Sequence, residues 1–578
     1  MSGVSADATA ANQMVPLFQH AEALHAAGLL DDAERLYRTI LVAVPAHVEA
    51  LHQLGVVMYQ LGRHDEALRL IDHALEIDPA HDRALNTRAV VLIALDRRDE
   101  ALASYDRALS VVPHNAVVAA NRGDLLAGLE RHDEALISYE LALATAAGST
   151  QAKQGRAASL LALDRGQEAL DAFDVLLIRE PDSATAHLGR GKSLMLLDRQ
   201  EEAATSFAAA LRCQPDLSDA QLALAEAFCL LGRFQEAVSL CDQLVTRFPD
   251  NAELRFNRSL CRLALGDLAG GWRDYEWRWQ LERVSSNVRD FGVPQWNGDT
   301  DISGKTILLH AEQGFGDVLQ FCRYAPLVAA YANVVLEVPG PLVRLLTSLP
   351  ARGQIIAQGE TLPPFDLHCP LLSLPFAANT TLDTIPTTTR YLAADPQAVA
   401  AWRERLAALD GVHVGLCWAG SPRPNDPAAN AIDRRRSVAL AHYLPLAAVS
   451  GVSLISLQKY AEGARITAPP AGMVIHDWTG ELQDFADTAA LIEALDLVIT
   501  VDTAVAHLAG ALGKPVWILN RYDACWRWLV DRDDSPWYPT ARLWRQPKPG
   551  DWDSVIARVA EALRDFVHAG PSRPITDR

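Results

Sequence analysis

The sequence predicts two architectures in one chain: a solenoid of paired α-helices, followed by an α/β region made of two lobes. Two observations carry this prediction. Alanine recurs every 34 residues through the first half, and from Thr306 short apolar runs rich in β-branched residues alternate with helical stretches. At 578 residues, with 49% hydrophobic and 21% charged side chains, the chain is too long for one small domain and has the composition of a folded protein.

The 34-residue period defines a repeating pair of antiparallel helices. Proline follows the same step in six of the seven periods and ends the second helix of each pair. A small residue in the first helix and an alanine in the second allow close approach, while a bulky residue fills the gap. The repeating alanines are Ala33, Ala67, Ala101, Ala135, Ala169, Ala203 and Ala237. The turns between helices fall at Gly28, Gly62, Asp96, Glu130, Asp164, Asp198, Gly232 and Gly266.

This register resembles the tetratricopeptide repeat over residues 14–285, in about eight units. Stacked helix pairs form an extended concave surface that usually holds peptides or proteins, so a protein partner is expected. The array is also similar to that of O-GlcNAc transferases, where an asparagine ladder grips the acceptor backbone. That resemblance implies acceptor contacts at Gln53, Asn121 and Asn257; the alternative is a solvated face on a segment of net charge −14 over residues 1–285.

The eighth unit ends in a cluster of aromatic residues, Trp272, Trp277 and Trp279. A terminal repeat lacks a neighbour on one side, so we expect these rings to dock it onto the following domain. A role as a capping core is at least as compatible with the pattern as contact with a ligand.

The second half divides into segments by pattern. Residues 286–305 are rich in Gly, Pro and Asp and predict a linker. Strand and helix then alternate in residues 306–395 and again in 396–550, which predicts two Rossmann-like lobes with a cleft between them. The helix predicted at 551–568 is expected to pack across both lobes.

Charge and composition exclude several classes. A net charge of −20 and a pI near 5.3 oppose binding to nucleic acid or to anionic membranes. The amino terminus shows no signal-peptide pattern and no apolar stretch is long enough to span a bilayer, so we expect a cytoplasmic protein without membrane insertion. The eight cysteines show no C-x-x-C spacing, which favours reduced thiols buried in cores.

The first motif that could carry chemistry is HAEQGFGDVLQF, after the first strand of the first lobe. Gly314 and Gly316 allow a tight turn close to a ligand, and Asp317 lies where the next helix begins. The third glycine of a dinucleotide fingerprint is missing, so NAD binding is weakly supported. Asp317 is either a catalytic group or a helix cap.

The second motif is LVITVDTAVAHLAGALGKPVWIL, in the second lobe. Asp502 and Thr503 fall at a helix start, where free N–H groups and the helix dipole favour an anion such as a nucleotide diphosphate. His507 lies one turn further on and reaches the same anion, or is an ordinary structural histidine.

The third group comprises CWAGSPRPNDP, the run DRRRSV and the strand end SLQKY. Lys459, one of six lysines, follows Gln458 just past a strand, and Arg434 to Arg436 form a cationic run just before a predicted helix. Cations on the cleft side neutralise phosphate without a metal; a solvated patch is the alternative. The acidic run Asp531 to Asp534 reads as surface charge, and no metal or other cofactor is expected.

Taken together, these motifs closely resemble the catalytic region of bacterial tetratricopeptide-repeat glycosyltransferases, which is similar to that of heptosyltransferases and has the two-lobed GT-B fold. The resemblance implies a metal-independent, inverting transferase with Asp317 as the base. It implies a donor site at Gly314, Gly316, Trp418, Gly420, Arg436, Gln458, Lys459, Asp502, Thr503 and His507.

We therefore expect a glycosyltransferase that moves a sugar from a nucleotide-sugar to a Ser or Thr hydroxyl of a protein recruited by the repeats. Some bacterial members of this architecture modify flagellin, which makes flagellin the most specific acceptor to test. The alternatives are transfer to a non-protein glycan or lipid, as in heptosyltransferases, and a scaffold without catalytic activity.

Overall fold

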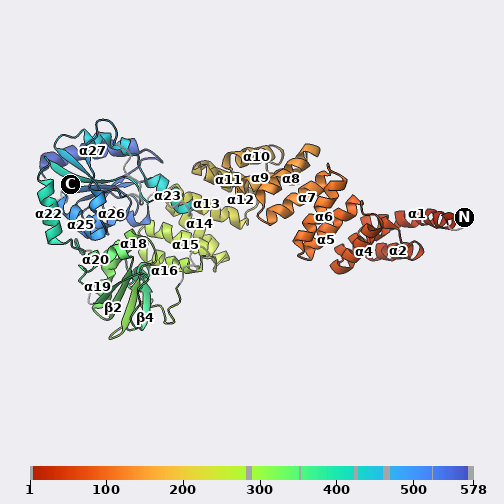
Figure 1. The fold of residues 1–578 in the computed structure, drawn as a ribbon, viewed down its shortest axis with the longest axis horizontal. Helices are drawn as coiled ribbons and strands as arrows, with labels where there is room; N and C mark the ends of the chain where they lie inside the picture. The colour runs from red at the N-terminus through yellow and green to blue at the C-terminus, as the bar shows by residue number, and fades with distance from the viewer. Residues whose placement is uncertain are drawn as a thin grey trace. The chain divides into compact units, whose positions relative to one another are not determined.

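The computed structural model describes residues 4–281, 289–350, 353–386, 388–421, 427–459, 469–523 and 525–570. They form two compact units, Met1–Ala223 and Leu224–Arg578, which are described in turn (Figure 1). The predicted fold class is confirmed: a helical solenoid is followed by an α/β region with two parallel sheets. No described helix combines the length and apolarity needed to cross a bilayer.

Unit 1 is built from consecutive antiparallel helix pairs. Side chains of the residues that precede the first helices of several pairs cap them, among them His47, His81, Asn115 and Ser149, each accepting a backbone N–H three residues on. The helices are α1 (Val4–Ala26), α2 (Leu30–Ala43), α3 (Val48–Gln60), α4 (His64–Ile77), α5 (Asp82–Ala94), α6 (Arg98–Val111), α7 (Ala116–Gly128), α8 (His132–Thr145), α9 (Thr150–Ala162), α10 (Gly166–Arg179), α11 (Ala184–Leu196) and α12 (Gln200–Cys213).

The predicted turn position is confirmed at every repeat by its backbone geometry. All eight turn residues have positive φ, including the four that are not glycine: Asp96, Glu130, Asp164 and Asp198, at 55° to 59°. This left-handed conformation costs a non-glycine residue some free energy. Because the φ values of the acidic residues match the left-handed region that glycine uses, the two helices of each repeat are connected in the same way at all eight turns.

The small and bulky positions fit against one another, as the period predicts. A Cβ atom added to Gly123 would lie 2.6 Å from Cε1 of Tyr139, and one added to Gly155 would lie 2.5 Å from the same atom. Tyr139 is 1% exposed, so its ring is enclosed between the two glycine helices α7 and α9. Close packing of this kind leaves no room for one extra methyl group.

We predict that Gly123→Ala destabilises unit 1 by about 1–3 kcal/mol, because the ring of Tyr139 must move to admit the methyl group. Gly128→Ala in the same helix meets no atom within 4 Å and should stabilise it by about 0.5–1 kcal/mol, since alanine loses less backbone entropy in a helix. Thermal unfolding followed by circular dichroism measures both, and equal effects of the two substitutions would refute the packing argument.

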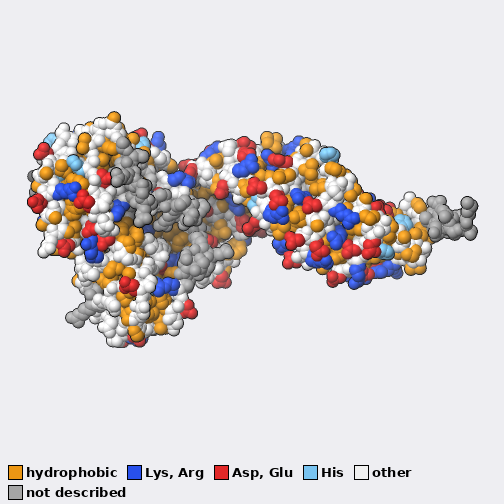
Figure 2. Space-filling model, in the orientation of Figure 1, with side chains coloured by type: hydrophobic (Ala, Val, Ile, Leu, Met, Phe, Trp, Pro, Cys, Tyr) orange, Lys and Arg blue, Asp and Glu red, His pale blue; other side chains and the backbone are white. Residues whose placement is uncertain are grey.

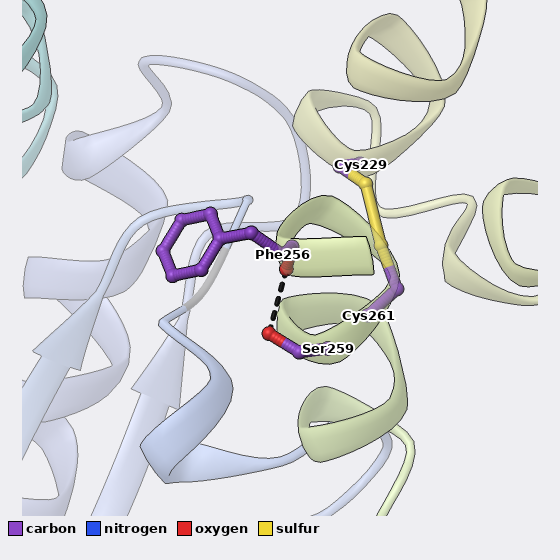
Figure 3. Close-up of a disulfide and its surroundings, with 4 residues drawn as sticks. All are labelled: Cys229, Phe256, Ser259 and Cys261. Atoms are coloured by element: carbon purple, nitrogen blue, oxygen red, sulfur yellow. Dashed lines mark hydrogen bonds between the residues drawn. A yellow bond between two sulfur atoms is a disulfide. The ribbon is translucent and has the colours of Figure 1, made fainter. Parts of the chain in front are cut away.

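Unit 2 begins inside helix α13 (Ser218–Leu230) and continues with α14 (Phe234–Arg247), α15 (Ala252–Ala264), α16 (Leu268–Tyr275) and the 3-10 helix η1 (Glu276–Gln280). Cys229 and Cys261 form a disulfide between α13 and α15 (Figure 3). The expectation that all eight cysteines are free is therefore wrong for these two. Their separation of 32 residues is close to the repeat period, so the first helices of successive pairs bring them together.

One of the three clustered tryptophans docks these helices onto the α/β region. Trp272 is 1% exposed and meets Phe321 and Trp526 edge to face, with ring centroids 5.8 and 5.1 Å away. Trp277 and Trp279 instead lie under the guanidinium groups of Arg255 and Arg278. The predicted docking role is thus carried by Trp272.

The first sheet has four parallel strands in the order β3-β2-β1-β4. Its strands are β1 (Thr306–His310), β2 (Asn333–Val338), β3 (Gly353–Ala357) and β4 (Leu367–Pro370), and its helices are α18 (Phe315–Phe321), α19 (Ala325–Ala329), α20 (Gly340–Leu346) and α21 (Leu374–Ala377). The segment predicted as a linker joins this lobe, because Trp296 donates its backbone N–H to the carbonyl of His368 on β4.

The second sheet has six parallel strands in the order β10-β9-β8-β5-β6-β7. Its strands are β5 (Val412–Cys417), β6 (Val452–Ser456), β7 (Ile475–His476), β8 (Leu497–Val501), β9 (Val516–Asn520) and β10 (Ala541–Arg545), and its helices are α22 (Pro396–Leu406), α23 (Pro427–Arg436), α24 (Leu444–Ala447), α25 (Phe485–Ala494), α26 (Ala504–Ala511) and α27 (Trp552–Ala569).

One predicted position differs in the structure. Helix α27 buries Trp552, Val555 and Val559 in the core of the second lobe, with Val414 and Leu454 of its sheet, and does not cross to the first. It has one apolar face, and the second sheet covers that face. The arginine run 434–436 ends helix α23 and also precedes a helical segment, as predicted, formed by the 3-10 helix η5 (Leu440–Tyr443) and α24.

Candidate functional site

Three loops of the second lobe end at the same edge of its sheet. Strands β6, β5 and β8 are neighbours, and each is followed by a predicted site segment: Gln458 and Lys459, Trp418 to Gly420, and Asp502 with Thr503. The carboxyl ends of parallel strands meet at one edge, which is where open α/β sheets bind ligands. The structure therefore brings together three loops of the predicted donor site, although Trp418 and Thr503 lie 85 positions apart in the sequence.

Gln458 holds two of these loops in register. Its side-chain Oε1 accepts the backbone N–H groups of Trp418 at 3.1 Å and Ala419 at 2.8 Å, and Gln458 is 3% exposed. Trp418 is buried in the core of the lobe. Both residues thus shape the loop after β5, and the predicted contact of the Trp418 side chain with a donor stays a prediction.

Arg436 joins the loop after β5 to the loop after β8. Its Nη1 donates to the carbonyl of Asp502 at 2.9 Å, and its Nε and Nη2 donate to Asp433 Oδ1 at 3.0 and 2.9 Å. A Cβ atom at Gly420 would displace the ends of the Asp433 and Arg436 side chains, so the loop after β5 lies close against this ion pair. The side chain of Arg436 is 23% exposed, so an anion can reach it.

Thr503 directly precedes helix α26 in an extended conformation (φ −139°) and its hydroxyl lies 3.2 Å from that of Thr500. Thr500 donates its own proton to the carbonyl of Val501, so Thr503 is the donor in this pair. Asp502, Thr503 and Ala504 are half-buried. The amino end of α26 is thus reachable, and its dipole favours an anion.

His507 lies on the buried side of α26, 4% exposed. Its Nδ1 is 2.9 Å from the hydroxyl of Tyr538, and its ring stacks on Trp528 at 5.3 Å. Burial, reinforced by the positive charges of Arg527, Arg323 and Arg436, holds its pKa well below the usual 6.5. The imidazole is therefore neutral at pH 7 and forms part of the packed wall behind the helix tip.

The glycine turn of the first lobe lies directly against this wall. A Cβ atom placed on Gly316 would be 2.9 Å from Cδ2 of His507 and 3.7 Å from Cα of Ala504. The beginning of α18 and the beginning of α26 therefore meet. Gly314, Gly316 and Asp317 of the first lobe and Thr503 and His507 of the second are brought into one region.

We predict that His507→Gln makes unit 2 less sensitive to acid. Because the pKa of His507 is lowered in the folded state, only the unfolded chain binds a proton below about pH 6.5, so the histidine destabilises the fold as pH falls. Between pH 7 and pH 5 the wild type should lose about 2 kcal/mol more than the variant.

Urea unfolding at the two pH values, followed by tryptophan fluorescence, measures this difference. All 13 tryptophans lie between positions 272 and 552, so the signal reports unit 2 alone. Parallel pH dependence of wild type and variant would refute a neutral buried His507.

Asp317 occupies the third position of α18, and both of its carboxylate oxygens hold donors. Oδ2 accepts the backbone N–H of Gly314 at 3.0 Å, and Oδ1 forms an ion pair with Arg527. The capping contact weighed from the sequence is thus present. The carboxylate remains 17% exposed, and its role as a base stays a prediction.

Arg527 is the principal site residue that the motifs did not identify. Besides Asp317, it donates to Gln320 Oε1 at 2.9 Å and to Cys525 Sγ at 3.2 Å. Burial alone would lower its pKa, but the Asp317 carboxylate, Cys525 and Tyr275 together outweigh burial and raise it. The position lies 210 residues from Asp317, beyond the reach of any local pattern.

Two further polar residues at the end of β9 were also missed. Asn520 Nδ2 and Arg521 Nη1 are buried without a hydrogen-bond partner. They lie at the carboxyl end of β9, which is the neighbour of β8 in the sheet. The order of the strands is therefore the signal that points to them. Lys459, in contrast, is exposed, and its ammonium donates to the carbonyl of Leu482.

The predicted acceptor residues are divided between the units. Gln53 lines a groove of about 490 Å³ in unit 1, together with His52, Arg83, Asn86 and Thr87. Asn121 lies on α7, donates to Asn86 Oδ1 at 3.2 Å and accepts from Gln151 at 3.1 Å, so amides link neighbouring repeats. Asn257 lies half-buried on α15 in unit 2. Figure 2 shows acidic and basic side chains interspersed over the visible face of unit 1.

Comparison with protein families agrees with this division. Residues 24–91 match one tetratricopeptide-repeat family, and residues 86–151, 155–218, 203–252 and 222–271 match a second. Residues 452–522 match glycosyltransferase family 9 (heptosyltransferase). The last range contains Gln458, Lys459, Asp502, Thr503 and His507.

A curated relative and solved structures show partial likeness. The protein FlbA of Caulobacter vibrioides is 28% identical over 344 residues, 55% of this chain, and the match spans only about half of that relative's length, 56%. The tetratricopeptide-repeat protein YrrB is 21% identical over 32% of this chain and 95% of its own (TM-score 0.30), and the type IV pilus biogenesis factor PilW is 25% identical over 36% and 96% (TM-score 0.33). The chain thus combines tetratricopeptide repeats with a glycosyltransferase family 9 region.

Proposed function

We propose that the protein is a glycosyltransferase that moves a sugar from a nucleotide-sugar to a Ser or Thr hydroxyl of a protein. The observation that carries the proposal is the meeting of the Gly314–Asp317 turn with the amino end of α26. The family 9 match to the segment that contains α26 supports it. An anion site and a carboxylate in one region are the two components that such a transfer needs.

The donor diphosphate binds at the amino end of α26. Backbone N–H groups at the helix start donate to phosphate oxygens, and the Thr503 hydroxyl joins them by turning its proton from Thr500 to the anion. The Arg436 guanidinium, held at the Asp502 carbonyl, supplies positive charge. Lys459 and Arg527 are the further cations of this region. Together they neutralise the leaving group without a metal ion at the transfer site.

Asp317 acts as the general base. The acceptor hydroxyl gives its proton to the carboxylate while its oxygen bonds to the anomeric carbon; the bond from that carbon to phosphate breaks, and the nucleotide diphosphate leaves with the electron pair. Attack from the face opposite the leaving group inverts the anomeric configuration. Arg527 must release Oδ1 before this step, and the arriving diphosphate offers it a second anionic partner.

The repeats recruit the acceptor. The groove that contains Gln53 and the amide contacts of Asn121 offer donors and acceptors for a polypeptide backbone, as concave repeat surfaces commonly do. Flagellin is the first acceptor to test, because of the resemblance described above, and the reaction would take place in the cytoplasm. A glycan or lipid acceptor is the alternative.

We predict that Asp317→Asn lowers the rate of transfer by about 100-fold or more, because an amide cannot take the acceptor proton. The amide still accepts the Gly314 N–H but loses the ion pair with Arg527, so circular dichroism is used to verify that the variant is folded. Transfer is measured by the mass shift of candidate acceptors, and binding of nucleoside diphosphates by calorimetry. Full activity of the variant would exclude Asp317 as the base, and absence of heat with every nucleotide in the wild type would favour a scaffold.

We predict that Gln53→Ala combined with Asn121→Ala raises KM for a protein acceptor by about 10-fold, from the loss of hydrogen bonds to its backbone. Hydrolysis of the donor in the absence of acceptor should not change. Val42→Ala, on an 84% exposed side chain of α2 outside the groove lining, is the matched control. Unchanged KM in the double variant would favour a non-protein acceptor.

A further inference from the structure

Three side chains of metal-ligating type meet beside the unit 1 groove, and one of them, His52, lines it. Glu49 and His52 lie one turn apart on α3, and His81 caps the amino end of α5 in the next repeat. One ligand atom from each lies within 4.8 Å of the other two. His81 Nε2 is 3.2 Å from Glu49 Oε1, and His52 Nδ1 is 3.9 Å from Glu49 Oε2.

The hydrogen bonds of His52 determine which of its nitrogens carries the proton. The Thr87 hydroxyl donates its hydrogen to the carbonyl of Arg83 at 2.9 Å, so its oxygen accepts from His52 Nε2, also at 2.9 Å. The proton therefore sits on Nε2 and Nδ1 carries a lone pair. A second hydrogen bond that orients a ligating imidazole in this way is typical of metal sites.

The lone pair on His52 Nδ1 accepts no hydrogen bond. His52 is 4% exposed, and its Nδ1 has no hydrogen-bond partner, while the group that faces it is a carboxylate. Two electron-rich atoms 3.9 Å apart repel each other unless something positive lies between them. Burial lowers the pKa of His52 to about 4, so the ring is neutral at pH 7, as a ligand must be.

His81 contributes at the cost of two hydrogen bonds, one at each ring nitrogen. Its Nδ1 accepts the backbone N–H of Ala84 at 3.1 Å, which leaves the proton on Nε2, directed at Glu49. Binding a cation through Nε2 moves that proton to Nδ1 and ends the cap. Arg83 donates to Glu49 Oε2 at 3.1 Å and holds the carboxylate in place.

We propose that Glu49, His52 and His81 bind a divalent transition-metal ion of the zinc class, with water completing the coordination. Two imidazole nitrogens and a carboxylate oxygen are the ligands that such ions select. The ion would connect the first helices of two successive repeats and stiffen the groove wall that His52 and Arg83 line. This site is independent of the sugar-transfer reaction, for which no metal is expected.

The test is calorimetric titration of the full, untagged chain with Zn²⁺ after treatment with a chelator. Glu49→Gln keeps one oxygen, which accepts from either Arg83 or His81, and removes the anionic ligand. His81→Asn removes the nitrogen ligand and keeps the cap, since Asn115 and Asn251 cap the corresponding helices α7 and α15. Each should weaken Zn²⁺ binding at one site by at least about 10-fold.

His47→Asn is the matched control, because His47 caps α3 in the same way one repeat earlier and is not a ligand. It should leave the affinity unchanged. Zn²⁺ should also raise the midpoint of thermal unfolding in the wild type and in His47→Asn, but not in the two ligand variants. The cysteines are the same in every variant, so binding to thiols cancels in the comparison.

Three results would overturn the proposal. They are wild-type affinity in Glu49→Gln, equal losses in His81→Asn and His47→Asn, and no Zn²⁺ site in the wild type beyond those that both ligand variants retain. Circular dichroism of each variant confirms that a loss of binding is not a loss of fold.

Discussion

The contact between Gly316 and His507 determines how the two α/β lobes meet within unit 2. The glycine has no side chain, so the turn approaches the imidazole to within van der Waals distance. Arg323, 3% exposed, fixes the same junction by donating to the carbonyl of Trp537 at 2.7 Å and to the hydroxyl of Tyr391 at 3.0 Å. A buried guanidinium with these partners leaves the junction little freedom to slide.

The repeats and the site loops were predictable because both depend on patterns that local sequence contains. A 34-residue period specifies its own neighbours, and the left-handed turn at Glu130 occurs in register with that at Gly62. The loops that carry Gln458 and Thr503 were found because parallel strands end at one edge of a sheet, whatever their order along the chain.

The rest depends on contacts that no local pattern encodes. Arg527 pairs with Asp317 across the two lobes, and a single arginine in a tryptophan-rich loop contains no local signal that predicts its partner. Helix α27 packs on the second sheet because its apolar face meets an apolar face there. The sequence alone does not predict which of the two sheets offers that face. The disulfide between Cys229 and Cys261 is the exception, since a separation of 32 residues approximates the repeat and places both cysteines on the first helices of successive pairs; C-x-x-C spacing does not reveal it.

The double engagement of Asp317 has a consequence for an enzyme that holds an activated sugar in water. The Gly314 N–H and the Arg527 guanidinium each occupy one oxygen of this carboxylate, so about half of its four lone-pair sites are already taken when the acceptor is absent. Under the proposed function, a water molecule that enters before the acceptor finds Asp317 still paired with Arg527. Hydrolysis of the nucleotide-sugar is then disfavoured until the acceptor binds.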